Sequence, residues 1–309
     1  MAGASADLVD PDALAAGERA SELRDFWLLL KPGVMQLVLA TAWVALYLAP
    51  GALHPVLAVA TMLCIATGAG AAAAINNWYD HDIDRRMVRT RQRPTACGRI
   101  APADALTFGL ALAILSVMTM GLAVGWLAAG LLAGTIVFYV AVYTMWLKRR
   151  HAQNIVIGGA AGATPPVIAW AAATGGIDAL PLVMAAIIFL WTPPHFWALA
   201  LYRQADYAGV KVPMLPVTAG AAATRRQIFA YAVLLLPVAL LPTLMGALGW
   251  LYGTAALALG AIFVGHAWRL GRDGDDAAAL RTFRFSLAHL FVLFLCMALD
   301  RAVAGGWTP

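Results

Sequence analysis

Long apolar stretches alternate with short polar segments along most of this chain. Nine stretches approach the roughly 20 residues that a helix needs to cross a bilayer. They cover residues 34–49, 55–77, 105–125, 128–147, 154–173, 180–201, 229–248, 252–270 and 285–303. The first is short, and the apolar residues 26–30 can extend it at the interface. The pattern predicts an all-α polytopic membrane protein with nine transmembrane helices.

The composition agrees with this prediction. Of the 309 residues, 62% are hydrophobic and 12% are charged, whereas a soluble domain has about 25% charged residues. The net charge of +5 is scattered between apolar stretches, so it does not indicate nucleic-acid binding. The three cysteines are far apart and imply neither a disulfide framework nor a metal site.

The N-terminal segment is rich in acidic and basic residues and has no apolar core of a signal peptide. We expect residues 1–25 to be a mobile cytoplasmic tail that leads into an interfacial helix around residues 18–30. Residues 26–309 are then expected to form a single domain.

The basic residues predict the orientation of the chain. All but one of the 21 Lys and Arg residues lie in the N-terminal segment or in the loops after the second, fourth, sixth and eighth stretches. By the positive-inside rule, the N-terminus and these loops are cytoplasmic and the C-terminus lies outside. The long polar loops share the cytoplasmic face, while the opposite loops are tight turns. A site for a water-soluble head group should therefore open to the cytoplasm, above a cavity suited to an apolar tail.

A polar motif follows the second stretch, where the chain should leave the bilayer. Asn76, Asp80 and Asp84 are spaced four apart, which places them on one helical stripe about 80° wide. Carboxylates this close repel each other unless a cation lies between them. Mg²⁺ prefers oxygen ligands and typically binds one or two carboxylates together with the phosphates of a substrate. Five arginines follow within ten residues. Arginines bind phosphate groups well, so this cluster indicates a site for a metal-bound polyphosphate. Asp82 points elsewhere and is expected to pair with a neighbouring arginine. The alternative is a solvated, helix-capping loop.

Two further segments carry candidate chemistry. The loop after the fourth stretch contains Lys148 and Arg150, which could bind an anion or simply anchor the chain at the membrane surface. The next stretch is rich in small residues and contains Pro165 and Pro166, which should bend its helix.

The sixth stretch contains a second pair of prolines, which predicts a second break, followed by His195. A histidine inside a membrane span is a functional candidate, whereas His266 and His289 are expected to be hydrogen-bonded structural residues. Tyr202 and Asp206 lie one turn apart at the exit, and Asp206 could face Asp80 and complete a second metal site. Aromatic residues gather at both exits, either as an interfacial belt or to stabilise a carbocation.

These motifs resemble those of the UbiA prenyltransferase superfamily. The acidic motif alone carries the resemblance to the superfamily, and four longer motifs narrow it to the branch that farnesylates haem. The first three are Lys31-Pro32, the run from Asp80 to Pro94, and the segment from Leu147 to Gly159. The fourth is the segment from Trp191 to Trp197, which is followed later by the segment from Val212 to Pro216. The second Asp-rich motif of the superfamily is reduced here to Tyr202 and Asp206.

The resemblance implies nine helices around a central cavity in the cell (inner) membrane. It implies Mg²⁺-dependent transfer of farnesyl from farnesyl diphosphate to a vinyl group of haem B, and terminal oxidase assembly factors as possible partners. The residues implied to hold metal are Asn76, Asp80, Asp84 and Asp206. Those implied to act on the substrates are Arg89, Arg93, Lys148, Arg150, Asn154, His195, Tyr202 and Asp206.

Three alternatives remain open from the residues. The acceptor could be an aromatic acid or quinone precursor. The chain could be a transporter, although its far face shows only tight turns. It could also be a haem chaperone that consumes no diphosphate.

Overall fold

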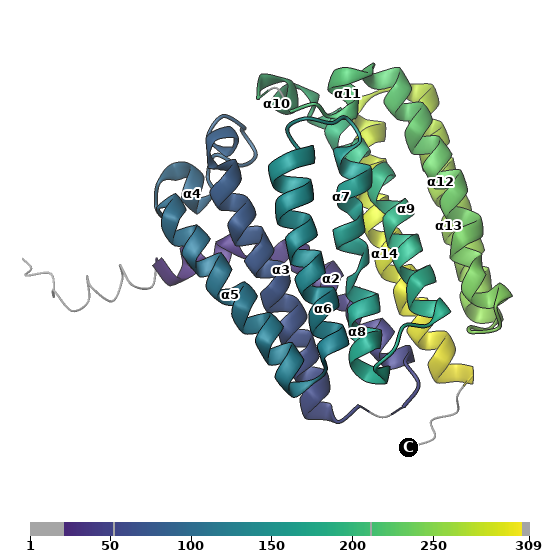
Figure 1. The fold of residues 1–309 in the computed structure, drawn as a ribbon. Helices are drawn as coiled ribbons and strands as arrows, with labels where there is room; N and C mark the ends of the chain where they lie inside the picture. The colour runs from purple at the N-terminus through teal and green to yellow at the C-terminus, as the bar shows by residue number, and fades with distance from the viewer. Residues whose placement is uncertain (1–21, 52, 211, 305–309) are drawn as a thin grey trace, which may run out of the picture.

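The computed structural model describes residues 22–51, 53–210 and 212–304, and within these ranges all regular structure is helical. Figure 1 shows the helices arranged as a bundle. After the helix Glu22–Leu29, the long helices are α2 (Pro32–Leu48), α3 (Pro55–Asp84), α5 (Pro102–Ala123), α6 (Trp126–Val137), which continues as η1 (Phe138–Leu147), α7 (Asn154–Ala163), α8 (Pro165–Thr174), α9 (Ala179–Tyr202), α12 (Gly220–Leu244), α13 (Trp250–Asp273) and α14 (Asp276–Ala304). The short helices are α4 (Pro94–Cys97), α10 (Gln204–Gly209) and α11 (Leu215–Thr218).

The predicted all-α membrane fold is confirmed. In the described part of the chain, eight helices are long and apolar enough to cross a membrane, or nine if the bent pair Glu22–Leu29 and Pro32–Leu48 is one span. The bend is 49°. It occurs at Lys31, whose backbone is left-handed (φ 54°, ψ 59°) immediately before Pro32. Proline disfavours the right-handed helical region for the residue before it, so the helix cannot run through this point.

The two proline pairs behave differently. Pro165 and Pro166 begin α8, directly after α7 ends at Ala163, as predicted. Pro193 and Pro194 instead lie inside α9, which runs without interruption from Ala179 to Tyr202. The prediction of a second helix break is therefore wrong. α9 packs against α7, α12 and α14, and this packing compensates for the backbone hydrogen bonds that proline removes.

One end of the bundle collects the polar connections. α4, α10 and α11 lie at this end, together with the C-terminal end of α3 and the start of α12 (Figure 1). α2 contacts α3, α8 and α14, so it joins the first and last parts of the chain. The main apolar core lies deeper between the helices and includes Ile168, Ile187 and Phe294. The cytoplasmic loops expected from charge alone therefore converge on one face.

Candidate active site

The predicted polar stripe lies on the last two turns of α3. The helix continues to Asp84, past the end expected from hydrophobicity, so the motif is helical rather than a loop. Asn76, Asp80 and Asp84 are only 2%, 0% and 2% exposed, whereas the side chain of Asp82 is 45% exposed. The three residues therefore share a buried face, and the interpretation as a solvated loop does not hold.

Basic side chains from three separate segments meet this stripe. The Nζ atom of Lys31 donates to Oδ1 of Asn76 at 2.6 Å. Lys148 pairs with Asp80, and Arg93 pairs with Asp84 at 2.7 Å. Each buried carboxylate thus has a cationic partner, as the cost of burying an isolated charge requires.

Arg149 is a site residue that the sequence interpretation missed. Its guanidinium donates to the carboxylate of Asp82 at 2.6 and 2.9 Å and to the carbonyl of Tyr79 at 2.8 Å. It also lies 3.6 Å from Oδ1 of Asp80. The hydrogen bond to Asp82 is the main cause that raises the pKa of Arg149 above its ordinary value. Asp82 pairs with an arginine as predicted, but the partner is Arg149, which is 67 residues away in the chain, and not a neighbouring arginine. The run of three basic residues after η1 was the available signal for Arg149.

A π-helix positions this basic segment. η1 has the wider π-helical hydrogen bonding, which often marks functional sites. The hydroxyl of buried Thr144 accepts from Nδ2 of Asn76 at 3.2 Å, and the hydroxyl of Tyr79 donates to the Met145 carbonyl at 3.1 Å. α7 can approach η1 because Gly158 has no Cβ, which would lie 2.3 Å from the ring of Tyr143. The motif on α3 and the basic loop are thus tied together before any substrate binds.

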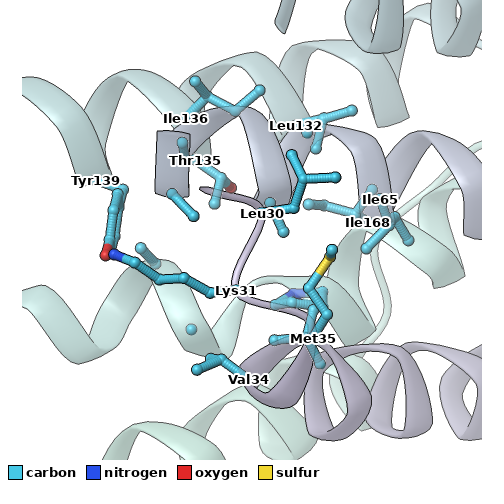
Figure 2. Close-up of a pocket in the computed structure, with 18 residues that line it drawn as sticks. Leu30, Lys31, Val34, Met35, Ile65, Leu132, Thr135, Ile136, Tyr139 and Ile168 are labelled. Carbon is cyan, nitrogen blue, oxygen red and sulfur yellow. The ribbon is translucent and has the colours of Figure 1, made fainter. Parts of the chain in front are cut away.

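An apolar cavity of about 160 Å³ lies beside the stripe. Side chains from the segment 30–38 and from α3, α6, η1, α7 and α8 line it. Figure 2 shows Lys31 reaching across the cavity toward Tyr139, with Leu132 and Ile136 on one side and Met35 on another. Because Lys31 both lines this cavity and binds Asn76, it connects the polar stripe to the apolar space.

Among the described residues, three predicted site residues form no hydrogen bond or ion pair with the stripe. Arg89 and Arg150 are exposed, and neither forms an ion pair within the described ranges. Asn154 is fully buried and donates to the His151 carbonyl at 2.7 Å, while its Oδ1 has no hydrogen-bond partner. Roles for these three residues stay predictions.

The residues of the proposed second metal site lie at the end of α9 and on α10. Asp206 lies on α10, and its buried Oδ2 has no hydrogen-bond partner. Tyr202 is half-buried, with the Arg203 guanidinium 4.8 Å from its ring centre. Across the residues that the structure describes, no group of three or more His, Cys, Asp or Glu side chains is arranged to hold a metal. A metal role for Asp206 therefore stays a prediction.

His195 is buried between α9 and α14. Its ring stacks on Trp191 and Phe283, with centroids 4.3 and 4.7 Å away, and its Nδ1 lies 2.7 Å from the hydroxyl of Ser286. That hydroxyl donates its one hydrogen to the Phe283 carbonyl at 2.6 Å, so it accepts from Nδ1–H of His195. Nε2 then carries the free lone pair. His195 is not among the residues that line the apolar cavity.

The expectation that His289 is hydrogen-bonded is wrong. His289 is fully buried, but neither ring nitrogen has a hydrogen-bond partner, because Phe263 and Phe285 surround it at centroid distances of 5.0 and 6.2 Å. The aromatic residues at the two exits do not line the apolar cavity, whose lining contains Tyr139. Whether they form an interfacial belt or stabilise a carbocation stays a prediction.

The donors of the stripe fit a magnesium ion. Asp80 and Asp84 are carboxylates, and Asn76 adds an amide oxygen, which is the hard-ligand chemistry that Mg²⁺ prefers. Oδ1 of Asp80 is buried and has no hydrogen-bond partner, which leaves an acceptor for a further cation. Two carboxylates suffice, because Mg²⁺ usually completes its shell with substrate phosphates and water.

The fold and the site together define an intramembrane helical protein with a buried acidic motif above an apolar cavity. The model of the UbiA prenyltransferase family matches residues 37–295. The chain belongs to the UbiA prenyltransferase family.

Similar proteins support this assignment. The protoheme IX farnesyltransferase of Parvibaculum lavamentivorans is 54% identical over 289 residues, covering 92% of this chain and 91% of the relative. Protoheme IX farnesyltransferase 2 of Mesorhizobium japonicum is 55% identical and covers 96% of both chains. Among solved structures, a digeranylgeranylglyceryl phosphate synthase has a TM-score of 0.76 at 14% identity, covering 91% of this chain and 98% of that one. A UbiA homologue from Archaeoglobus fulgidus bound to GPP and Mg²⁺ has a TM-score of 0.64 at 17% identity, covering 88% and 99%.

Proposed function

We propose that this chain transfers the farnesyl group of farnesyl diphosphate to a vinyl group of haem B and so makes haem O for haem–copper oxidases. The observation that carries the proposal is the buried stripe of Asn76, Asp80 and Asp84, which Lys31 joins to an apolar cavity. Relatives at 54% and 55% identity carry the name protoheme IX farnesyltransferase over almost the whole length of both chains, which supports haem as the acceptor.

The stripe binds the diphosphate end of the donor. Asn76, Asp80 and Asp84 would hold Mg²⁺, with Asp206 as a further candidate ligand. Bound there, the metal would neutralise charge on the leaving diphosphate as a Lewis acid. Lys31, Arg93 and Lys148 already face the stripe, so their charges lie where the leaving group needs them. Arg89 and Arg150 are proposed to approach the diphosphate from the surface.

The cavity beneath Lys31 holds the isoprenoid. Its lining is apolar, with side chains such as Val34, Leu132 and Ile136. A dry environment protects an allylic cation from capture by water before the acceptor reaches it. Tyr139 presents an aromatic ring to the same space, and ring faces attract cations.

His195 holds the haem acceptor. Since Ser286 accepts the Nδ1 hydrogen, the free Nε2 lone pair suits an iron atom, whereas a propionate would need a donor. Trp191 and Phe283 stack on the ring and fix its plane. Asn154 and Tyr202 are proposed as further substrate contacts.

The reaction then needs no strong base. The carbon–oxygen bond of the donor breaks, and the bonding electrons leave with diphosphate. The vinyl carbon of haem attacks the farnesyl cation, which places the positive charge next to the porphyrin. Water adds there and loses a proton, and the product carries one farnesyl and one hydroxyl group.

The orientation follows from the distribution of positive charge. Arg93, Lys148 and Arg149 lie at one end of the bundle, so this end is proposed to face the cytoplasm, with the C-terminus on the outer side of the inner membrane. Both substrates would enter from that face or from the bilayer, and terminal oxidase assembly factors would receive the haem O.

The test uses the purified full chain with farnesyl diphosphate, haem B and Mg²⁺. The expected result is haem O, identified by chromatography and mass, together with diphosphate release. Asp84→Ala should abolish turnover while the protein remains in the membrane fraction. Asp104→Ala removes an exposed carboxylate at the start of α5 and should leave turnover unchanged.

Three results would count against the proposal. Near-normal haem O formation by Asp84→Ala would contradict the metal assignment. Prenylation of an aromatic acid in place of haem would identify a different acceptor. Haem binding by the wild type without any diphosphate release would favour a chaperone or a transporter.

A further inference from the structure

A second basic cluster lies on the outer surface between α12 and α13, away from the stripe on α3. Three arginines and two exposed aromatic side chains surround a hollow there. They are Arg225, Arg226, Phe229, Trp268 and Arg272. The start of α12 and the end of α13 lie at the same end of the bundle as α10 and α11 (Figure 1). The cluster therefore lies where these helices reach the membrane surface.

Small residues create the hollow. Ala222 on α12 and Ala267 and Gly271 on α13 line it. Because these residues lack bulk, the two helices leave an open space of about 620 Å³ between the larger side chains. Trp268 is 54% exposed and Phe229 is 37% exposed at its edges, so both rings are available to a ligand or to lipid.

The charge of the cluster is only partly neutralised. Arg226 is exposed and forms no ion pair with any residue that the structure describes. Arg272 uses Nε to donate to Asp273 at 2.8 Å, and its guanidinium carbon lies 5.2 Å from the centre of the Trp268 ring. Arg225 donates to the carbonyl of Gly274 at 3.5 Å, at the end of α13. Arg226 and Arg272 therefore keep N–H donors that are not used within the described part of the protein. A guanidinium group can bind a phosphate through two such donors that lie in one plane.

The surface below the cluster is apolar. Val233 on α12 lies one turn below Phe229, and Leu257 on α13 lies three turns below Trp268 on the same face; they are 44% and 52% exposed. Such side chains face lipid in a membrane-spanning bundle. A ligand with a phosphate at one end and acyl chains at the other would match both parts of this surface.

We propose that the hollow between α12 and α13 binds the phosphate head group of an anionic phospholipid, whose acyl chains run along the outer faces of these two helices. Basic pockets between transmembrane helices are typical sites for anionic lipid head groups. A free phosphate would satisfy the arginines but would leave the exposed rings and the apolar surface without a partner. The site lies on different helices from the stripe, so it does not depend on the identity of the acceptor.

The experiment titrates the purified full chain in neutral detergent with phosphatidylglycerol and measures the bound lipid by native mass spectrometry. Phosphatidylcholine and inorganic phosphate are titrated in parallel. The test variant is R226Q/R272Q, since Arg225 also bonds the end of α13 and is left intact. The control is R281Q/R284Q, which removes the same charge from exposed positions on α14.

The wild type should bind phosphatidylglycerol more tightly than phosphatidylcholine. R226Q/R272Q should weaken phosphatidylglycerol binding about tenfold or more, and R281Q/R284Q should change it little. R226K/R272K keeps the charge but not the planar fork, so it should lose less than the glutamine pair. Thermal unfolding in lipid-free detergent should be the same for all variants, because these arginines are exposed.

Four results would overturn the proposal. Equal loss in both glutamine pairs would show a diffuse surface charge instead of a site. Equal binding of phosphatidylcholine would remove the head-group preference. Displacement of phosphatidylglycerol by inorganic phosphate at equal concentration would assign the hollow to a soluble anion. Unchanged binding by R226Q/R272Q would exclude the hollow altogether.

Discussion

Lys31 connects a strained backbone to the candidate active site, and this connection can be tested. Among the described residues, Lys31 is the only residue other than glycine whose φ is positive, at 54°. The left-handed conformation costs an L-residue roughly 1–2 kcal/mol. Its Nζ binds Oδ1 of Asn76 at 2.6 Å, and its stem lines the apolar cavity. We infer that the strain is tolerated because this conformation places the ammonium group between the polar stripe and the cavity.

Two substitutions separate the charge from the strain. Lys31→Met keeps the chain length and the left-handed backbone but removes the charge. Lys31→Gly also removes the charge, and it relieves a strain of roughly 1–2 kcal/mol while adding only about 0.5–1 kcal/mol of unfolded-state entropy. A hydrogen bond to a charged group is worth about 1.5–3 kcal/mol, so both variants should lose about 10- to 150-fold in affinity for farnesyl diphosphate.

The assay measures kcat and KM for farnesyl diphosphate with saturating haem B, together with thermal unfolding in the same detergent. Both variants should show the loss in kcat/KM, and Lys31→Gly should be at least as stable as Lys31→Met. A wild-type kcat/KM in Lys31→Met would refute the assignment of the ammonium group to the diphosphate. A lower stability of Lys31→Gly than of Lys31→Met would refute the strain argument.

The remaining predictions concern the basic loop, its packing and the metal. Arg149→Met should lower kcat/KM about tenfold with little loss of stability, because its bonds to Asp82 and Tyr79 are partly exposed and solvent screens them; unchanged kinetics would contradict a positioning role. Gly158→Val should destabilise the fold by about 1–3 kcal/mol, because its Cβ would lie 2.3 Å from the Tyr143 ring, and an unchanged melting temperature would contradict this. Chelation of divalent ions should stop diphosphate release, and added Mg²⁺ should restore it; turnover in excess chelator would exclude a metal role.

Hydrophobic length and charge placement were sufficient to predict the helices. A membrane span must satisfy its backbone internally, so long apolar stretches leave little choice but helix. The stripe on α3 was also predictable, since spacing by four residues places side chains on one helical face whatever the surroundings. The bend at Lys31 has a local cause, which is the proline that follows it. The local sequence does not indicate the direction of the Lys31 side chain.

The partners of the stripe could not be assigned from the sequence. Lys148 and Arg149 are adjacent and both basic, yet Lys148 pairs with Asp80 and Arg149 with Asp82. The turn after the π-helix η1 decides which cation faces inward, and local sequence does not determine that register. For the same reason, the sequence did not indicate Arg149 as a partner of the carboxylates on α3. The missing partner of His289 likewise depends on how α13 and α14 pack around it.

The sequence by itself determined that this chain is a helical membrane protein, which of its loops are basic, and that three polar side chains share a face at the end of one helix. These features are local, because they depend on the properties of single residues and on the period of the helix. Only the tertiary structure decided that Lys31, Arg93 and Lys148 meet that face, that an apolar cavity lies beside it, and that α12 and α13 leave a basic hollow on the outside. Such contacts join residues far apart in the chain, and packing selects them.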